Sequence, residues 1–514
     1  MRKDRRSGDT PLIPHTLVLR YGNAEEPTIE RHSEIVDREG YTWWGWWKKT
    51  WEPFPKEALE FLARTVRDGT LQVGLVSRKE EPFELAVARC AGIQYHEDGR
   101  NQRSPEDGAF TPEYYRDHPD GFPAWFKFDR LRRVEREEFL GLFGVIPNRE
   151  PTFYDVKSTR QGPEAFPRLE WDMSPVPSPG RSILHLSDLH FGPDHGYPLP
   201  GDELLGRASP LSLLDVVSRR VKELPVTIGC VVASGDFTTR GDANYLPAAR
   251  RFLQELLAAL GLSERHLVMV PGNHDMWLVD VEHPTRDYAH ENPYRDWVNG
   301  IFHADEPLVE LERVRHYIVP GDRHLVFIEL NSVRPRNDAL KNYGYVAAHR
   351  YRELLEFANR TLRDQGIAAE RVFLAVALHH HLIPVLDEMA PTEESPVSVC
   401  LDAAAMVRHF QEAGVDAVLH GHQHLPFVAA LAHCGGAGDS FPKHPLYLLG
   451  SGSAGVTSTR LCEGSHFNSF SVYTPADEGL LVSVQRYLPS TWPTNDLDRT
   501  LPWSWGGWQR GATT

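Results

Sequence analysis

Cysteine is scarce in this sequence of 514 residues, which carries five, scattered along the chain and odd in number. No two of them form a Cys-x-x-Cys pair, so neither a disulfide framework nor a zinc ribbon is expected. Long apolar runs are missing as well, and the basic start of the chain, Met1–Arg6, is not followed by the apolar stretch of a secretory signal. These absences predict a soluble, cytoplasmic protein that has no membrane as a partner.

Basic residues are outnumbered, since 55 Lys and Arg face 71 Asp and Glu and leave a net charge of −16. This acidic balance disfavours a protein that coats nucleic acid with its whole surface, although it is compatible with a local basic patch. The composition is otherwise that of a globular protein, with 41% hydrophobic and 25% charged residues. At this length two or three domains are expected.

Proline marks a boundary in the chain. Residues 161–180 contain five prolines, which exclude a helix and predict a semi-rigid linker. Before the linker, residues 1–160 combine helical periodicity with short strand-like runs, which predicts a small α+β accessory domain. After it, residues 181–490 repeat a pattern of strand, loop and helix typical of an α/β domain. Residues 491–514 form a tryptophan-rich tail that is expected to be a loop.

The accessory domain contains an aromatic run, Tyr41–Trp51, that holds five of the 13 tryptophans in the chain. One interpretation is packing in a core or a domain interface, because indole rings bury a large apolar area. A second is a platform that stacks a base or another flat ligand, with Lys48 and Lys49 beside it. A third is a patch for a partner protein. We expect the domain to sense or position a ligand.

Polar side chains follow five predicted strands of residues 181–490. The clearest case is 267–275, where a short apolar strand stops at a Pro-Gly pair and is followed by Asn273, His274 and Asp275. The other strand ends carry Asp188 with His190, Asp236, His379 or a neighbour, and His422 with His424. Each alone is more often a turn or a cap. Five such ends in successive units predict a shared site, because the ends of parallel strands lie along one edge.

The donor atoms of this set suit two metal ions. The set comprises two carboxylates, one amide and four imidazoles, from Asp188, Asp236, Asn273, His190, His379, His422 and His424. These are too many for one tetrahedral zinc and fit two ions that share a bridging ligand. Asp236 is the expected bridging ligand, because no other candidate ligand follows the same strand. Mixed imidazole and carboxylate ligands favour Mn, Fe, Zn or Co over Ca or Mg.

Taken in order, these motifs resemble those of the calcineurin-like metallophosphoesterases. The resemblance rests on Asp188-x-His190, Gly235-Asp236, Gly272-Asn273-His274-Asp275, His379 and Gly421-His422-x-His424. It implies a four-layer α/β sandwich, in which two β-sheets are flanked by helices. It implies a first metal held by Asp188, His190, Asp236 and His424, and a second held by Asp236, Asn273, His379 and His422. It also implies that Asn273 and His274 take part in catalysis, that His274 protonates or steadies the leaving oxygen, and that a bridging hydroxide attacks.

Within that family, residues 234–238 and 272–275 look most like the class III cyclic nucleotide phosphodiesterase branch. Phosphoprotein phosphatases carry Val-Asp-Arg-Gly and a Glu where this chain has residues 238–241 and Asp275. The expected function is therefore hydrolysis of a phosphodiester, a cyclic nucleotide or a related small molecule. The alternatives are a nuclease of the same family, with nucleic acid as its partner, then a phosphomonoesterase or a non-catalytic scaffold.

Some roles stay open in the sequence. The family often shows His-His-Pro where this chain reads from His379 to Pro384 with three histidines, so His380 is an alternative ligand to His379. His420 is interpreted as supporting the last motif, and Asp275 as orienting His274. Residues 276–320 are interpreted as an irregular, partly helical cap over the site.

Overall fold

The structure is a computed structural model, and it divides the chain into two compact units. The first unit comprises Met1–Glu170 with Ala347–His349, and the second comprises Trp171–Val346 with Arg350–Thr514. The residues described are 16–22, 27–68, 71–77, 83–116, 118, 120–147, 151–156, 171, 173–198, 211–239, 241–276, 292–302, 311–333, 341–384, 398–432, 445–461, 467–477, 479–487 and 494–501. Most of the predicted linker lies outside them, and the predicted extents of the four segments stay predictions.

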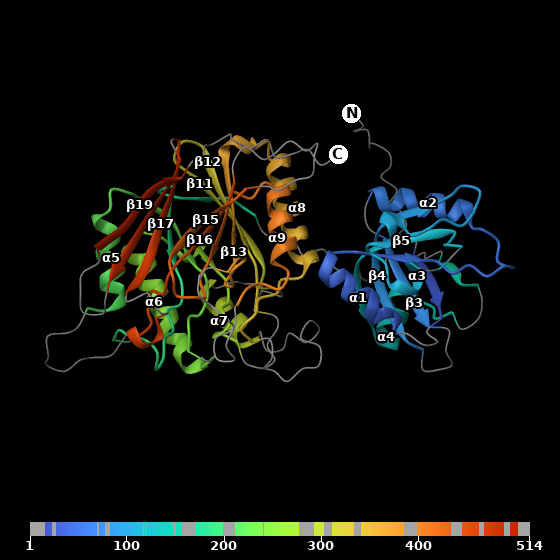
Figure 1. The fold of residues 1–514 in the computed structure, drawn as a ribbon, viewed down its shortest axis with the longest axis horizontal. Coiled ribbons are helices and arrows are strands. Elements are labelled where there is room, and N and C mark those ends of the chain that lie inside the picture. The colour runs from blue at the N-terminus through green and yellow to red at the C-terminus, as the bar shows by residue number, and fades with distance from the viewer. Residues whose placement is uncertain are drawn as a thin grey trace, which may run out of the picture. The chain divides into compact units, whose positions relative to one another are not determined.

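The first unit is built on one mixed sheet (Figure 1). Its elements are β1 (Thr16–Tyr21), α1 (Thr28–Glu39), β2 (Thr42–Gly45), α2 (Lys56–Asp68), β3 (Leu71–Ser77), β4 (Leu85–Tyr95), η1 (Pro105–Gly108), α3 (Glu113–Arg116), β5 (Ala124–Arg133), α4 (Arg136–Phe143) and β6 (Phe153–Val156). The strand order is β2-β5-β4-β3-β1-β6. Only the β1–β3 pair is parallel among these pairings of described strands.

Helices cover both faces of this sheet. The side chains of β1 accordingly alternate between two apolar cores. Leu17 and Leu19 lie in one core with Leu59 of α2. Val18 lies in the other with Phe139 of α4. This period of two is that of a strand buried on both sides.

The aromatic run is split between core and surface. Trp43, Trp44 and Trp46 are buried, and the indole N–H of Trp46 donates to Thr152 Oγ1 at 3.0 Å. Trp47 and Trp51 are 50% and 59% exposed. Core packing therefore holds for three of the five tryptophans, whereas Trp47 is half-exposed and packs edge-on against His118 and Phe122, and Trp51 is mostly exposed.

The second unit contains two sheets. Its elements are β7 (Val176–Pro177), β8 (Ser182–Leu186), α5 (Leu213–Glu223), β9 (Ile228–Ala233), η2 (Ala243–Tyr245), α6 (Leu246–Ala259), η3 (Glu264–His266), β10 (Leu267–Met269), α7 (Asn292–Phe302), β11 (Arg313–Val319), β12 (Arg323–Glu329), α8 (Ala348–Asp364), η5 (Ala369–Arg371), β13 (Val372–Ala377), α9 (Ala403–Glu412), β14 (Ala417–His420), β15 (Phe427–Leu431), β16 (Leu446–Gly450), η6 (Ser458–Arg460), β17 (Asn468–Ala476), β18 (Gly479–Tyr487) and β19 (Thr494–Leu501). The sheet orders are β10-β9-β8-β17-β18-β19 and β15-β16-β14-β13-β12-β11-β7.

These two sheets stack face to face between helices. Val232 of β9, Phe327 of β12 and Phe373 of β13 share one core, which lies between the sheets. Val217 of α5 and Phe252 of α6 belong to a second core on the outer face of the first sheet. Figure 1 shows α5 and α6 on one flank of the strands and α8 and α9 on the opposite flank. The predicted four-layer α/β sandwich with a smaller N-terminal domain is confirmed.

Several elements differ from the sequence prediction. Residues 276–320 were expected to be irregular, but Arg313–Val319 forms β11, antiparallel to β12. Its arginines conceal the strand pattern, and Arg313 is buried because it pairs with Glu329 on β12. The loop predicted for the tail is wrong over Thr494–Leu501, which pairs with β18 as β19. The chain's described residues contain no helix with the length and apolarity needed to cross a membrane.

Candidate metal centre

The predicted donors follow the carboxyl ends of five strands that belong to both sheets. Asp188 and His190 follow β8, Asp236 follows β9, Asn273 follows β10, His379 follows β13, and His422 and His424 follow β14. β8, β9 and β10 run parallel in one sheet, and β13 and β14 run parallel in the other. The stacked sheets therefore bring two rows of strand ends together.

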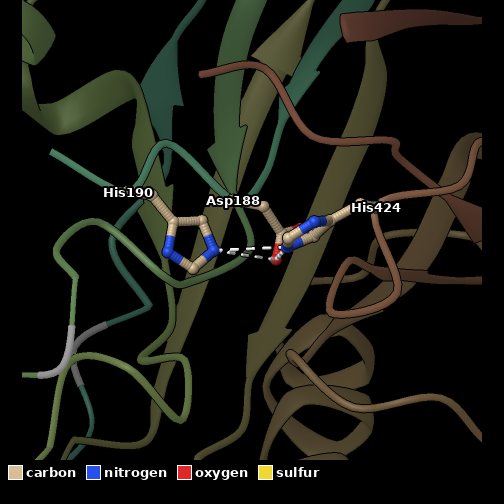
Figure 2. A group of neighbouring side chains, drawn as sticks. All are labelled: Asp188, His190 and His424. Carbon is tan, nitrogen blue, oxygen red and sulfur yellow. Dashed lines mark hydrogen bonds and ion pairs between the residues drawn. The ribbon is translucent and has the colours of Figure 1, made fainter. Parts of the chain in front are cut away.

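Asp188, His190 and His424 form a first group of donors (Figure 2). The Nε2 atoms of His190 and His424 lie 3.2 Å apart, and His424 Nε2 lies 3.4 Å from Asp188 Oδ1. His190 Nε2 lies 3.9 Å from the same oxygen. Asp188 is fully buried and His190 is 3% exposed, so the group lies inside the protein.

Asp236, His379 and His422 form a second group, and Asn273 joins it. His379 Nε2 lies 3.4 Å from Asp236 Oδ2, 3.0 Å from Asn273 Oδ1 and 3.1 Å from His422 Nδ1. Asp236 Oδ2 also lies 3.5 Å from His190 Nε2 in the first group. One carboxylate thus faces both groups, which is the position that a bridging ligand requires.

The spacing of these donors fits metal ions. Ligand atoms about 2.0–2.2 Å from one ion, at roughly tetrahedral or octahedral angles, are about 2.9–3.5 Å apart. Donor atoms within each group of three lie within 4.8 Å of one another, and most of the pairs above are 3.0 to 3.5 Å apart. Two of these pairs place nitrogen against nitrogen, an arrangement that a shared cation stabilises better than a single proton.

The outer nitrogens of three imidazoles are fixed by acceptors. His379 Nδ1 donates to Ser234 O at 2.7 Å, and His424 Nδ1 donates to Arg460 O at 2.9 Å, because a carbonyl oxygen can only accept. The Ser398 hydroxyl donates to Asn342 O, so it accepts from His422 Nε2. In its neutral form, each ring therefore presents its unprotonated nitrogen to the centre, as metal-binding histidines do.

The pKa values of these groups agree with cation binding. Burial lowers the pKa of His190 and of His422 to about 3, so both rings are neutral at pH 7. Burial opposes ionisation of Asp236, but the charges of His379 and His274 outweigh it and hold its pKa well below the ordinary value. The Asp236 charge likewise outweighs burial at His379 and raises its pKa to about 9. An incoming cation would displace that proton.

Left-handed backbone is concentrated at this site. Nine non-glycine residues among those described have positive φ, and five of them are predicted ligands: Asp188, His190, Asp236, His422 and His424. Each such residue costs about 1–3 kcal/mol unless its surroundings compensate. Glycine is needed beside them, because a Cβ at Gly272 would overlap Asp236 and one at Gly421 would overlap Ser187.

The structure also places the residues whose roles the sequence left open. His380 Nδ1 lies 2.9 Å from Ser332 Oγ, so His379 rather than His380 lies among the donors. His381 stacks on Phe427 at 5.4 Å. His420 is buried beside the same two rings.

Asp275 accepts two main-chain hydrogen bonds beside the site. Its Oδ1 accepts from Thr238 N and its Oδ2 from Gly272 N, each at 2.9 Å, so it ties the loops after β9 and β10 together. Burial, reinforced by the charge of Asp236, raises the pKa of this carboxyl to about 7. The ring of His274 lies 5.0 Å from that of His190 and is half-buried, outside both donor groups.

The predicted cap is described in part. Trp297 and Tyr294 of α7 pack on Phe237, the residue after Asp236, at ring distances of 5.0 and 6.2 Å. Residues 277–291 and 303–310 lie outside the described residues. α7 therefore supports the loop that carries Asp236.

Comparison with known proteins gives two family matches. Residues 181–426 match the model for calcineurin-like phosphoesterases, and residues 17–154 match a model described as Pua-like. No curated protein sequence matches the chain.

Three solved structures are similar to this chain at low sequence identity. Purple acid phosphatase PPD1 from yellow lupin is 12% identical, with 78% of this chain and 70% of that chain covered and a TM-score of 0.38. GAP50, the anchor in the inner membrane complex of Plasmodium, is 13% identical, with 64% of this chain and 91% of that chain covered and a TM-score of 0.34. Phosphopantetheinyl hydrolase PptH from Mycobacterium tuberculosis is 14% identical, with 54% of this chain and 90% of that chain covered and a TM-score of 0.27. Residues 181–426 thus form a domain of the calcineurin-like phosphoesterase family.

Proposed function

We propose that this chain hydrolyses a phosphodiester, a cyclic nucleotide or a related compound, with two divalent ions from the series Mn, Fe, Zn and Co. The observation that carries the proposal is the pair of donor groups with Asp236 between them, 3.5 Å from His190 Nε2 and 3.4 Å from His379 Nε2. Two ions at such a site supply positive charge that neutralises the phosphate and activates water. The family match supports a hydrolase that acts on phosphate esters.

His274 is the candidate proton donor. Its ring lies beside His190 and is partly exposed, so it can reach a substrate bound at the first group. Its main-chain N–H donates to Asp236 Oδ1 at 2.7 Å, which fixes the backbone from which the His274 side chain projects. Protonation of the leaving oxygen by a positioned imidazole typically contributes about 10²–10⁴-fold. Asn273, which lies at the second group, would orient a phosphate oxygen through its side-chain amide.

The preference for a diester rests on the motif. Residues 238–241 and Asp275 differ from the phosphoprotein phosphatase pattern, and the loop sequences resemble the cyclic nucleotide phosphodiesterase branch. The cyclic nucleotide phosphodiesterase branch is therefore supported by sequence likeness.

The test is Mn²⁺-dependent turnover of bis-p-nitrophenyl phosphate against p-nitrophenyl phosphate. We expect diester turnover that falls at least about 100-fold in His274→Ala and in Asp236→Ala. His96→Ala, a histidine of the first unit, is the matched control and should leave the rate unchanged. Turnover of the monoester alone would keep the site and overturn the diesterase. Absence of both turnover and bound metal would favour the scaffold.

A nuclease is the second candidate, and exposed aromatic rings favour it. Trp47 and Trp51 are half-exposed or more, and Lys49 Nζ lies 5.8 Å from the centre of the Trp51 ring. Exposed indoles beside a cation can stack bases of single-stranded nucleic acid. Two results would support this candidate. The parent should bind a fluorescent oligonucleotide with an affinity that falls as salt is added, and Trp51→Ala should bind it more weakly than the parent at the same salt concentration.

A further inference from the structure

The segment Asp188–His190 carries two predicted ligands in a conformation that side chains disfavour. Asp188 has φ of 53° and His190 has φ of 48°, both in the left-handed region. Between them, the Leu189 side chain is 1% exposed and lies in the core under the first sheet. The segment is thus fixed on one side by packing, and something must hold its backbone on the other.

Three successive carbonyl groups of this segment each accept a hydrogen bond from a different side chain. Ser453 Oγ donates to Asp188 O at 2.7 Å. His195 Nδ1 donates to Leu189 O at 2.8 Å, and Thr239 Oγ1 donates to His190 O at 3.1 Å. The donors come from three loops, after β16, β8 and β9 respectively.

The chemistry of these donors leaves little freedom. A carbonyl oxygen only accepts, so His195 carries its proton on Nδ1. Its ring is held between Phe191 and Tyr197, at centroid distances of 4.4 and 5.7 Å. Ser453 is fully buried and accepts in turn from Val456 N at 3.1 Å, and Thr239 is 3% exposed. Water therefore has little access to replace the bonds made by Ser453 and Thr239.

We propose that Ser453, His195 and Thr239 form a carbonyl clamp that keeps Asp188 and His190 in their left-handed conformation and so positions both for the first metal ion. The three are positioning residues and touch no substrate. The inference rests on the proposed function in one respect, since it takes the first donor group to hold a metal ion.

The clamp acts on one group more than the other. In the second group, His379 is oriented by Ser234 O and His422 by Ser398, and neither bond involves the clamp. Loss of a clamp bond should therefore weaken the first ion and leave the second in place.

The experiment measures metal binding to the full-length protein directly. Thr239→Val and Ser453→Ala each remove one donor with little change in shape, and Thr239→Ser keeps the hydroxyl. Thr474→Val and Ser451→Ala are matched controls, because both residues are buried and their hydroxyls bond to Ser182 Oγ and His185 O, outside the segment. Mn²⁺ content after dialysis against a series of concentrations is determined by mass spectrometry.

We expect two ions per chain in the parent, in both controls and in Thr239→Ser. In Thr239→Val and Ser453→Ala one ion should bind about 10–100-fold more weakly, the range for loss of a residue that orients a ligand. Parent-like affinity for both ions in these two variants would overturn the clamp while leaving the metal centre intact. A parent that binds no ion would overturn the centre itself, and the clamp with it.

Amide hydrogen exchange of the metal-free proteins tests the clamp without relying on metal binding. The amides of Asp188 and His190 donate to Gly235 O and Asp236 O, so they report on the segment. Peptides covering residues 186–192 should exchange faster in Thr239→Val than in Thr474→Val. Equal exchange in the two would contradict the clamp.

Discussion

Three of the four histidines in the candidate metal centre present one ring nitrogen to the centre and the other to the protein. His379, His422 and His424 each spend one nitrogen on an acceptor that fixes ring and tautomer. Ser398 differs from the other two acceptors because it is a side chain, so a substitution can remove it. Its hydroxyl donates to Asn342 O and can offer His422 only its lone pairs.

Ser398→Ala should therefore weaken the second ion and spare the first. Without the acceptor, His422 can rotate or place its proton on Nδ1, the nitrogen that faces His379 Nε2 at 3.1 Å. Mn²⁺ affinity at one of two sites should fall about 10–100-fold, with Ser398→Thr close to the parent. Combining Ser398→Ala with Thr239→Val should weaken both ions. If the two single variants lose the same ion, the assignment of one residue to each group is wrong.

Residue types sufficed to single out side chains that the structure brings together, whereas the groups that support them could not be predicted. All seven predicted ligands lie at the centre because each follows a strand end, a position that the apolar runs reveal. Ser453 lies 265 residues from Asp188 and acts through one hydroxyl, which leaves no local pattern. His195 and Thr239 lie near the motifs, but nothing in their sequence tells which carbonyl they reach.

Elements are predictable where a short apolar run marks a buried strand, and less so where polar residues are buried in pairs. β8 and β9 follow short, mostly apolar runs, and every residue of both strands is buried. β11 was missed because its arginine pairs with Glu329, a partner that the local sequence does not show. α1 was missed for a related reason, because its buried face includes His32, which is fully enclosed.

His32 should make the packing of α1 on β2 sensitive to acid. Its Nδ1 lies 2.8 Å from Thr42 Oγ1, its ring lies 4.5 Å from that of Trp44, and Nε2 has no hydrogen-bond partner among the described residues. Burial lowers the pKa of His32 to about 3, so the unfolded element, with an ordinary pKa near 6.5, binds the extra proton. The stabilisation is complete above pH ~6.5 and is lost as the pH falls toward 3.

Hydrogen exchange in α1 measures this effect. Between pH 7 and 5.5 the free energy of opening, corrected for intrinsic exchange, should fall by about 1 kcal/mol. His32→Phe keeps a ring in the site and should remove the dependence, whereas His96→Gln should retain it. An unchanged opening energy in the parent would show that His32 is protonated or solvated in the native state.

At the scale of the whole molecule, the chain combines a unit with a metal centre and a unit without a comparable cluster among its described residues. Each has its own buried cores, so each can unfold as a separate cooperative unit. All the predicted ligands belong to the second unit. Metal ions that bind its native state should stabilise it by mass action, by about 2.7 kcal/mol at a free concentration 100 times the dissociation constant.

Calorimetry of the full-length protein with Mn²⁺ and with EDTA tests this division. We expect two transitions, of which the one assigned to the second unit moves up in temperature with Mn²⁺ and down with EDTA, while the other stays in place. Asp236→Ala should abolish the shift, because the carboxylate that faces both donor groups is gone. The pH 5.5 transition of the first unit should drop in the parent and not in His32→Phe, which identifies it independently. A shift of both transitions with Mn²⁺ would mean that the first unit also binds the ion or that the two units unfold together, and would contradict their independence.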